Sequence, residues 1–445
     1  MEPNEQEIKT LSLPEAMALA IDFHVKGRLA EAEKVYLQIL AAMPENPDAL
    51  HFLGALLHQR GLSDSGLDLI KRSVELAPQR ADWYNDLGNV LFQRGEFLEA
   101  TEAFRKSIGI DPGDANVWNN LGTVLQRREH LDEAASAFQK AIGLNPDFVD
   151  ALNNFGNLLS IQGKVIESVD YLCKAFVLGP SHSQSKIERG IAFYKLGRIE
   201  EAAEVYRQLM IEQPDNPTAR HLYAACSGKN VPDRASDAYV ESTFDKYAEN
   251  FDTKLGKLSY RGPEMIAEAL AKVAKPEQKF NCLDAGCGTG LCGLVVAPYI
   301  SRLTGVDLSA RMLSMAAKRG VYNELVKEEL TSYLSRHSYT FDLIVSADTL
   351  IYFGALEELL KYASIALRAD GIAVLTAEEA GEVSEPGFRL NPHGRYSHSR
   401  KYLNTTLTAC GLEVLAMQSD ILRVEWDTPV NGLVVTARKT AKTLL

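Results

Sequence analysis

Hydrophobic and polar positions recur with a period of 34 residues over the first half of the chain. Glycine holds one position of this repeat, at Gly54, Gly88, Gly122, Gly156 and Gly190. Proline closes each unit, at Pro44, Pro78, Pro112, Pro146, Pro180 and Pro214. Between them, small residues and then large apolar residues recur with the same period. Six units in one register predict an array of repeated helical elements.

One unit shows why this pattern predicts a pair of helices. Trp83 begins a stretch with apolar residues at helical spacing, in which Gly88 leaves room for a neighbouring helix. Gly95 interrupts this first helix, and residues 97–110 supply the second. Pro112 ends the second helix because proline cannot donate the next backbone hydrogen bond.

This pattern resembles the tetratricopeptide repeat over roughly residues 13–216, with a capping helix beginning near His221. The departures are Gly66 and Ser168, where alanine is usual, and Tyr171, which lies one position out of register. The resemblance implies an all-α solenoid over residues 13–228.

Three asparagines suggest what the solenoid binds. Asn85, Asn119 and Asn153 occupy one position in successive first helices, which line the concave groove in this family. Their amides could hydrogen-bond the backbone of an extended peptide. Alternatively, asparagine merely suits the solvated face of the helix.

The repeat register ends at Gly228, and residues 229–262 predict a linker and a helix. Phe244, Tyr247 and Phe251 lie three and four residues apart and so share one helical face. They are either ordinary core residues or, as resemblance to enzymes that begin with a similar Phe-Asp-x-Tyr-Ala-x-x-Phe-Asp segment implies, a cover for a bound cofactor.

From residue 263 to residue 445 the pattern changes to short apolar strands that alternate with helices. Such alternation predicts a parallel sheet with crossover helices. Two longer strands, at residues 413–425 and 433–438, form an antiparallel pair at the end of the chain.

The first strand runs into the sequence Leu-Asp-Ala-Gly-Cys-Gly-Thr-Gly, which starts at Leu283. Glycines here allow a tight turn and close approach of a ligand. The spacing Gly288-x-Gly290-x-x-Gly293 also fits a dinucleotide fingerprint. However, Asp284 would repel a pyrophosphate and would attract an ammonium group.

The motif and the terminal strand pair resemble class I S-adenosylmethionine-dependent methyltransferases. The resemblance implies a Rossmann-like, seven-stranded domain with S-adenosylmethionine at the carboxyl ends of its strands. In it, Asp284 would hold the ammonium of the methionine moiety, Asp307 the ribose hydroxyls, and Glu329 with Leu330 the adenine. The other residues expected at this site are Gly286, Cys287, Gly288, Gly290, Leu308, Ala347, Tyr247 and Tyr260.

Candidates for the chemistry follow the fourth and fifth strands. Asp348 could act as a base or anchor the substrate, or it could serve the cofactor or cap a helix. Tyr352 follows as a substrate-binding candidate. In the polar insertion at residues 394–399, Arg395 could bind a carboxylate, and His398 and Tyr396 could take part in proton transfer. The alternative for this insertion is a solvated loop.

Charge and cysteines narrow the remaining choices. The net charge is −12, and most of the excess lies in the first half, which disfavours nucleic acid as a partner. The six cysteines contain no zinc-type spacing, so we expect reduced thiols and no metal. We also expect a cytoplasmic protein without a membrane span.

These patterns predict a methyltransferase whose repeats recruit a peptide or protein. Three alternatives stay open: an adaptor without turnover, a small-molecule methyltransferase that uses its repeats for assembly, and a nicotinamide oxidoreductase.

Overall fold

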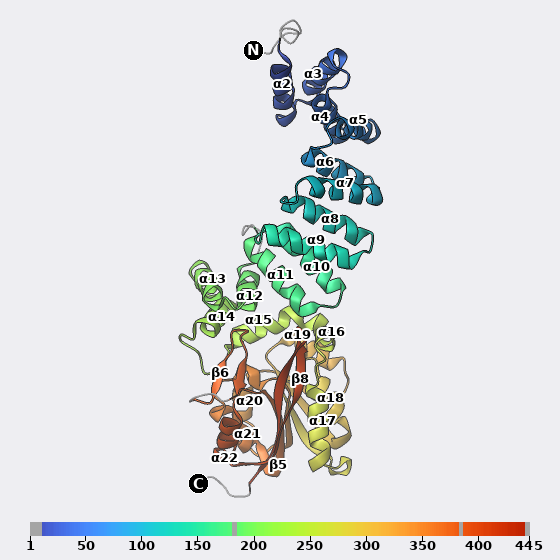
Figure 1. Cartoon of the computed structure of the whole chain (residues 1–445). Helices are drawn as coiled ribbons and strands as arrows, with labels where there is room; N and C mark the ends of the chain where they lie inside the picture. Colours follow the sequence, from blue (N-terminus) through green and yellow to red (C-terminus); the bar gives the residue numbers. More distant parts are fainter. Residues whose placement is uncertain (1–10, 180–184, 382–385, 441–445) are drawn as a thin grey trace. The chain divides into compact units, whose positions relative to one another are not determined.

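The computed structural model describes residues 11–179, 185–381 and 386–440 (Figure 1). The chain forms two compact units, Met1–Gly179 and Pro180–Leu445. Within the described residues, no helix is sufficiently long and apolar to cross a bilayer. All six cysteines are free thiols, as their spacing predicts.

The first unit is built from successive helix pairs, as the repeat pattern predicts (Figure 1). The pairs are α2 (Leu13–Val25) with α3 (Leu29–Ala42), α4 (Pro47–Gln59) with α5 (Ser63–Leu76), α6 (Ala81–Gln93) with α7 (Phe97–Ile110), α8 (Ala115–Arg127) with α9 (Leu131–Leu144), and α10 (Val149–Ile161) with α11 (Val165–Leu178).

The repeated glycine lets the two helices of a pair touch. A Cβ atom on Gly88 would lie 2.5 Å from the ring of Phe104 on the partner helix, so a side chain there would force the helices apart. In the fifth repeat, Leu172 packs against Gly156 in the same way. Leu172 therefore keeps the register at this position, from which Tyr171 is displaced by one residue.

The second unit begins with the sixth repeat. Helices α12 (Lys186–Lys195), α13 (Ile199–Glu212) and the cap α14 (Pro217–Ser227) group with the sheet that follows them. Gly228 ends α14 in the left-handed conformation, with a φ of 66°. Helix α15 (Asp237–Tyr247), η1 (Ala248–Asn250) and α16 (Phe251–Lys257) come next.

A seven-stranded sheet forms the centre of this unit, as predicted. Its strand order is β3-β2-β1-β4-β5-β9-β8, parallel from β3 to β5 and antiparallel at β9 and β8. The strands are β1 (Phe280–Ala285), β2 (Ile300–Asp307), β3 (Glu324–Lys327), β4 (Phe341–Ser346), β5 (Leu367–Glu378), β8 (Leu412–Glu425) and β9 (Thr428–Lys439). The accompanying helices are α17 (Gly262–Val273), α18 (Leu291–Val296), α19 (Ala310–Ala317), α20 (Leu330–Ser335), α21 (Glu357–Ala366) and α22 (Arg400–Ala409), with 3₁₀ turns η2 (Pro276–Gln278), η3 (Ala297–Tyr299) and η4 (Leu350–Tyr352).

This strand order places the functional residues. Strand β1 lies between β2 and β4, and the chain order reverses there. Ligands of open α/β sheets bind at such a switch point, beyond the carboxyl ends of the strands. Asp284, Asp307 and Asp348 all lie at or just after these strand ends.

The polar insertion is a folded hairpin, so the solvated-loop alternative is wrong. Strands β6 (Phe388–Leu390) and β7 (Tyr396–His398) pair antiparallel, and all three residues of β7 are buried. The hairpin lies against helix α14 and the end of β5, which removes the side chains of Ser397 and His398 from water.

Candidate functional site

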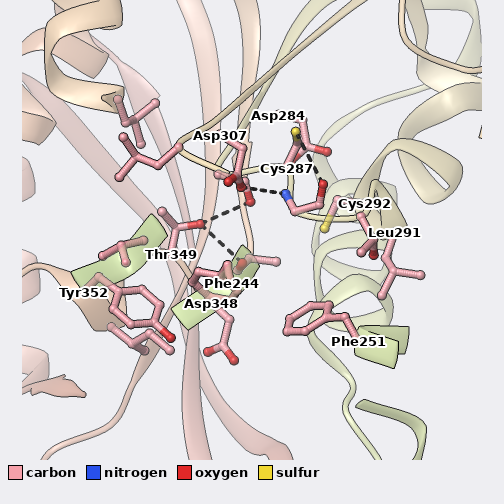
Figure 2. Close-up of a pocket in the computed structure, with 18 of the residues that line it drawn as sticks. Phe244, Phe251, Asp284, Cys287, Leu291, Cys292, Asp307, Asp348, Thr349 and Tyr352 are labelled. Atoms are coloured by element: carbon pink, nitrogen blue, oxygen red, sulfur yellow. Dashed lines mark hydrogen bonds between the residues drawn. The ribbon is translucent and has the colours of Figure 1, made fainter. Parts of the chain in front are cut away.

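A cavity of about 250 Å³ lies at the carboxyl ends of β1, β2 and β4, within the second unit (Figure 2). Figure 2 shows Asp284, Asp307 and Cys287 at one end, and Asp348 with Tyr352 and Phe251 at the other. Of the predicted site residues, the cavity is lined by Asp284, Gly286, Cys287, Gly288, Asp307, Leu308, Glu329, Leu330, Ala347, Asp348, Tyr260, Tyr352 and Arg395.

Asp284, near the end of β1, is a buried carboxylate that pairs with no cation among the residues that the structure describes. The side chain is 1% exposed, and the Tyr322 hydroxyl donates to its Oδ2 over 2.6 Å. Burial raises the pKa of Asp284 to about 7, and the Tyr322 hydrogen bond only partly offsets this rise. Asp284 is therefore prepared to ionise fully when a positive group enters the cavity.

The glycine loop turns where only glycine fits well. Gly286 has a φ of 75°, and a Cβ atom there would collide with the side chain of Thr349. Gly288 has a φ of 53° and faces open space, and its N–H donates to Asp307 Oδ2 over 2.9 Å. Gly290 lies outside the cavity and packs against Tyr322 instead.

Asp307 ends β2 with its carboxylate held from both sides. Oδ2 accepts from Gly288, and Oδ1 accepts from the N–H of Ser309 over 2.8 Å. Burial raises the pKa of Asp307, and the backbone N–H groups oppose this rise. The remaining lone pairs can accept hydrogen bonds from hydroxyl groups of a ligand.

Glu329 and Leu330 line the cavity beyond β3. The Glu329 carboxylate caps helix α20 by accepting from the N–H groups of Thr331 and Ser332, at 3.0 and 2.8 Å. This capping fixes the backbone at Leu330, whose side chain is 7% exposed. The pair therefore supplies an apolar surface next to a fixed acidic side chain.

Helices α15 and α16 cover the cavity with aromatic rings. Phe244 packs edge-on against both Phe251 and Tyr352, with ring centroids 5.7 and 5.4 Å apart. All three rings line the cavity, as does Tyr260. Tyr247 lies outside the lining, and Lys254 Nζ sits 3.5 Å from its ring centroid. The prediction of a cofactor contact for Tyr247 is not supported by this placement.

Two aspartates fasten this covering segment to the glycine loop and to α19. Asp245 Oδ1 accepts from the hydroxyl of Ser309 over 2.5 Å. Asp252 accepts from the hydroxyl of Thr289 over 2.6 Å and pairs with Arg319. Each aspartate directly follows a cavity-lining phenylalanine, so these contacts hold the rings over the cavity.

Asp348 meets the cavity in a strained backbone conformation, with a φ of 57°. Arg423 on β8 donates to both of its carboxylate oxygens, over 3.2 and 3.0 Å. The same guanidinium donates to Glu378 and, over 2.6 Å, to Glu425. Burial raises the pKa of Asp348, and the charges of Arg423 and Arg395 oppose this rise.

Arg395, predicted to bind substrate, lines the cavity and belongs to the same ionic network. It donates to Glu425 over 2.5 Å, and its Nε lies 3.5 Å from Glu378. Burial acts to raise the pKa of Glu378, but the hydrogen bond from His393 and the charges of Arg423 and Arg395 hold that pKa at about 2. The guanidinium of Arg395 thus lies beside two carboxylates and lines the cavity, while its Nε makes no hydrogen bond within the described residues.

His398 and Tyr396 lie outside the cavity lining, contrary to the prediction for catalytic residues. His398 is fully buried in β7, with Nε2 3.1 Å from the Gly354 carbonyl oxygen, and burial lowers its pKa to about 4. Tyr396 is also fully buried, and its hydroxyl donates to the Pro232 carbonyl oxygen over 2.6 Å. The contacts of His398 and Tyr396 therefore support a role in packing the hairpin.

The repeat asparagines hydrogen-bond across successive repeats. Asn120 Nδ2 donates to Asn85 Oδ1 over 3.1 Å, and Asn154 Nδ2 donates to Asn119 Oδ1 over 3.0 Å. Asn119 is only 8% exposed, whereas Asn153 is half-buried. Part of their hydrogen-bonding capacity is thus used within the solenoid.

Among the site residues that sequence reasoning missed are Arg423, Glu425 and Tyr322. Arg423 interrupts the apolar side of a long strand, and such a charge indicates a buried ionic partner. Glu425, two residues on, has the same facing in that strand. Tyr322 carries no comparable signal, because its contact with Asp284 depends on how the chain folds.

Comparison with protein families matches each half of the chain separately. A model of the methyltransferase domain matches residues 283–375. Models of the tetratricopeptide repeat match residues 17–81, 115–148 and 166–217, and another repeat model matches residues 88–129.

Two of the chain's relatives carry the name of a methyltransferase. The chain is 30% identical over 162 residues to the probable S-adenosylmethionine-dependent methyltransferase CRG1 of Saccharomyces cerevisiae, covering 34% of this chain and 54% of that protein. It is 32% identical over 111 residues to methyltransferase-like protein 27 of Homo sapiens, covering 24% and 43%. The chain thus spans about half the length of the curated relatives it matches.

Among solved structures, that of MamA is similar, with 28% identity and a TM-score of 0.34 over 36% of this chain and 93% of that chain. The structure of YrrB, described as a TPR protein with an unusual peptide-binding site, has 23% identity and a TM-score of 0.31 over 42% and 96%.

Proposed function

We propose that this chain, which joins tetratricopeptide repeats to a methyltransferase domain, transfers the methyl group of S-adenosylmethionine to an acceptor that the repeats help to recruit. One observation supports the transfer most strongly. Two carboxylates, the buried Asp284 and the half-buried Asp307, flank a glycine loop at the switch point of the sheet.

The residues of the cavity fit this cofactor group by group. Within the described part of the chain, Asp284 pairs with no cation, so it is available to pair with the ammonium. Asp307 can accept from the ribose hydroxyls, because its backbone contacts leave lone pairs free. The apolar surface at Leu330 and Leu308 suits the adenine ring. The space where a Cβ atom of residue 288 would lie is empty, so the backbone at Gly288 can approach the ligand closely.

The bound cofactor would supply a sulfonium, an already activated methyl donor. The protein's main contribution is then to orient the acceptor, and such positioning can supply roughly 7–11 kcal/mol. Phe244, Phe251 and Tyr352 would confine the acceptor against Asp348. Asp348 would hold the acceptor or take its proton, with its own orientation fixed by Arg423.

The charges at this end of the cavity favour a neutral or cationic acceptor. Asp348, Glu378 and Glu425 pair with Arg395 and Arg423, so three carboxylates meet two guanidinium groups, and His393 also contacts Glu378. The pairing leaves no positive charge in excess for a carboxylate acceptor, whose entry would leave charges unpaired in a buried site.

Recruitment by the repeats is proposed from the asparagine positions of the solenoid. Asn85, Asn119 and Asn153 recur in successive first helices, and amides can hydrogen-bond a peptide backbone. An array linked to the catalytic domain would raise the local concentration of a bound protein.

A small-molecule acceptor is the second candidate, and the covering segment favours it. Asp245 and Asp252 fasten α15 and α16 across the cavity, so an acceptor must be small enough to fit beneath them or be a single protruding side chain. In the small-molecule case, the repeats would serve assembly.

Calorimetric titration of the full chain with S-adenosylmethionine, and separately with NAD, tests the cofactor assignment. We expect binding of S-adenosylmethionine and none of NAD. Asp307→Asn should weaken the affinity about tenfold, because a neutral amide is a poorer hydrogen-bond acceptor. Asp215→Asn, an exposed change outside the cavity, is the control. Binding of NAD without S-adenosylmethionine would overturn the proposal.

A further inference from the structure

We propose, resting on the proposed methyl transfer, that the cap of the repeat array is part of the active site's support and that His221 on α14 is a positioning residue for Asp348. The evidence is a continuous set of contacts from α14, through the tip of the β6–β7 hairpin, to the ionic network at the cavity. All of these residues lie in the second compact unit.

The first contact holds the hairpin tip. His221 is 4% exposed, its Nε2 lies 2.8 Å from the Gly394 carbonyl oxygen, and its ring stacks on Tyr239 with centroids 4.0 Å apart. Burial lowers the pKa of His221, which favours the neutral ring. The neutral ring can carry its proton on Nε2 and donate it to the carbonyl oxygen. Gly394 has a φ of 88°, and a Cβ atom there would lie 2.9 Å from the Tyr239 hydroxyl and 3.0 Å from Leu222. The tip is thus enclosed between α14 and α15.

Further contacts fix the same hairpin to the last repeat and to the linker. Ala224 and Ala225 of α14 share an apolar cluster with Leu390 and Tyr396. The Tyr396 hydroxyl donates to Pro232, and the thiol of Cys226 lies 3.7 Å from the Pro392 carbonyl oxygen. On α12, the Tyr194 ring lies edge-on to that of His393, with centroids 6.5 Å apart.

A second group of contacts connects the tip of the β6–β7 hairpin to the ionic network at the cavity. Arg395 follows Gly394 directly and pairs with Glu425, which also accepts from Arg423. Arg423 in turn donates to both oxygens of Asp348. Because Arg395 is carried by the tip, a displacement of the tip moves one of the two guanidinium groups that balance Asp348, Glu378 and Glu425.

These contacts therefore indicate that the cap helix supports the ionic network at Asp348. A module that only recruited the acceptor would not need such contacts. Within the described part of the chain, no residue of helix α14 lines the cavity, and its contact with the hairpin tip leads to Arg395, so its influence should fall on the acceptor end and spare the cofactor end. Misplacement of a reacting group by about 1 Å can lower a rate on the order of 100-fold.

The test compares three variants of the full chain, using labelled S-adenosylmethionine and an extract of the native host as acceptor. His221→Ala removes the hydrogen bond and the stack, and His221→Gln keeps an N–H donor. His337→Ala is the matched control, because His337 also stacks on a tyrosine, Tyr333, at 4.0 Å and has a ring nitrogen, Nδ1, 2.7 Å from a backbone carbonyl oxygen, yet lies outside the cavity lining.

We expect His221→Ala to lower the maximal transfer rate tenfold or more at saturating cofactor, with the dissociation constant for S-adenosylmethionine changed less than twofold. His221→Gln should recover most of the rate, and His337→Ala should keep the wild-type rate. If His221→Ala does not fold, Tyr396→Phe probes the same hairpin by removing only the bond to Pro232, and we expect it to lower the rate while sparing cofactor affinity.

Equal rates for His221→Ala and His337→Ala would overturn the inference, as would a loss that appears only as weaker cofactor binding. Wild-type protein that transfers no label would instead count against the proposed function, so the two failures are distinguishable.

Discussion

Replacing Asp284 with asparagine should stabilise the cofactor-free protein by an amount that grows with pH. Burial raises the pKa of Asp284 from 3.8 to about 7 in the folded chain. The unfolded chain therefore loses this proton at lower pH than the folded chain. The cost of ionising the buried carboxyl is absent below about pH 4, grows between pH 4 and 7, and is complete above pH 7.

The size of the effect follows from the shift. One pKa unit corresponds to about 1.4 kcal/mol, so the native aspartate costs about 4 kcal/mol at pH 8 and about 2 kcal/mol at pH 5. Asp284→Asn removes the titration, and its other effects do not depend on pH. The stability advantage of the variant should therefore be larger at pH 8 than at pH 5 by about 2–3 kcal/mol.

The assay is urea unfolding at both pH values, read by pulsed hydrogen exchange and mass spectrometry on peptides of β1. This readout reports on the unfolding of the catalytic unit alone. The repeats can unfold in a separate transition, which the readout does not include. Asp215→Asn, at an exposed site, should show no pH-dependent advantage. An advantage of Asp284→Asn that is the same at pH 5 and pH 8 would refute the reasoning.

Three further predictions rest on other features. Affinity for S-adenosylmethionine should fall by up to tenfold per pH unit below about pH 7, because Asp284 must lose its proton to pair with the ammonium; calorimetry that finds equal affinity at pH 6 and 8 would contradict this. Arg423→Met should destabilise the second unit by about 3–5 kcal/mol, since it leaves Asp348 and Glu378 buried without their main partner; thermal unfolding that shows a loss below about 1 kcal/mol would contradict it. Gly122→Ala should cost the first unit about 1–3 kcal/mol, because the new Cβ would lie 2.6 Å from the Phe138 ring; urea unfolding of the repeats checks this, and an unchanged midpoint would exclude it.

The architecture could be predicted because its signals are local and periodic. The 34-residue repeat specifies which helix faces meet, and Gly88 opposite Phe104 shows the expected contact. Alternating strands and helices, with a terminal antiparallel pair, led to the seven-stranded sheet. The glycine loop could also be predicted from the sequence, because its residues are consecutive and their conformations follow from the absence of a Cβ atom.

The acceptor end could not be predicted in the same way. Asp348, Glu378, Arg395 and Arg423 come from four segments that only the folded sheet brings together. The polar residues at 394–399 fitted either a substrate site or a solvated loop, but the hairpin packs against α14, and His398 is buried there with its pKa lowered.

The repeat pattern ends at Gly228, whereas the first compact unit ends at Gly179, and this difference has a physical reason. The register continues to α14 because sequence periodicity reports only on contacts between neighbouring repeats. It carries no information on His221 and its contact with Gly394, which lies 173 residues away along the chain. Such long-range contacts have no periodic signature.

Transfer of labelled methyl from S-adenosylmethionine into an extract of the native host tests the central claim most directly. The full chain is compared with Asn119→Ala/Asn153→Ala, which alters the proposed peptide-binding positions, and with Asn116→Ala, an exposed change on the same helix α8. We predict label on a discrete protein with the wild-type chain and with Asn116→Ala, and at least tenfold less with the double variant. Absence of label from every protein and small molecule, despite bound cofactor, would contradict the account.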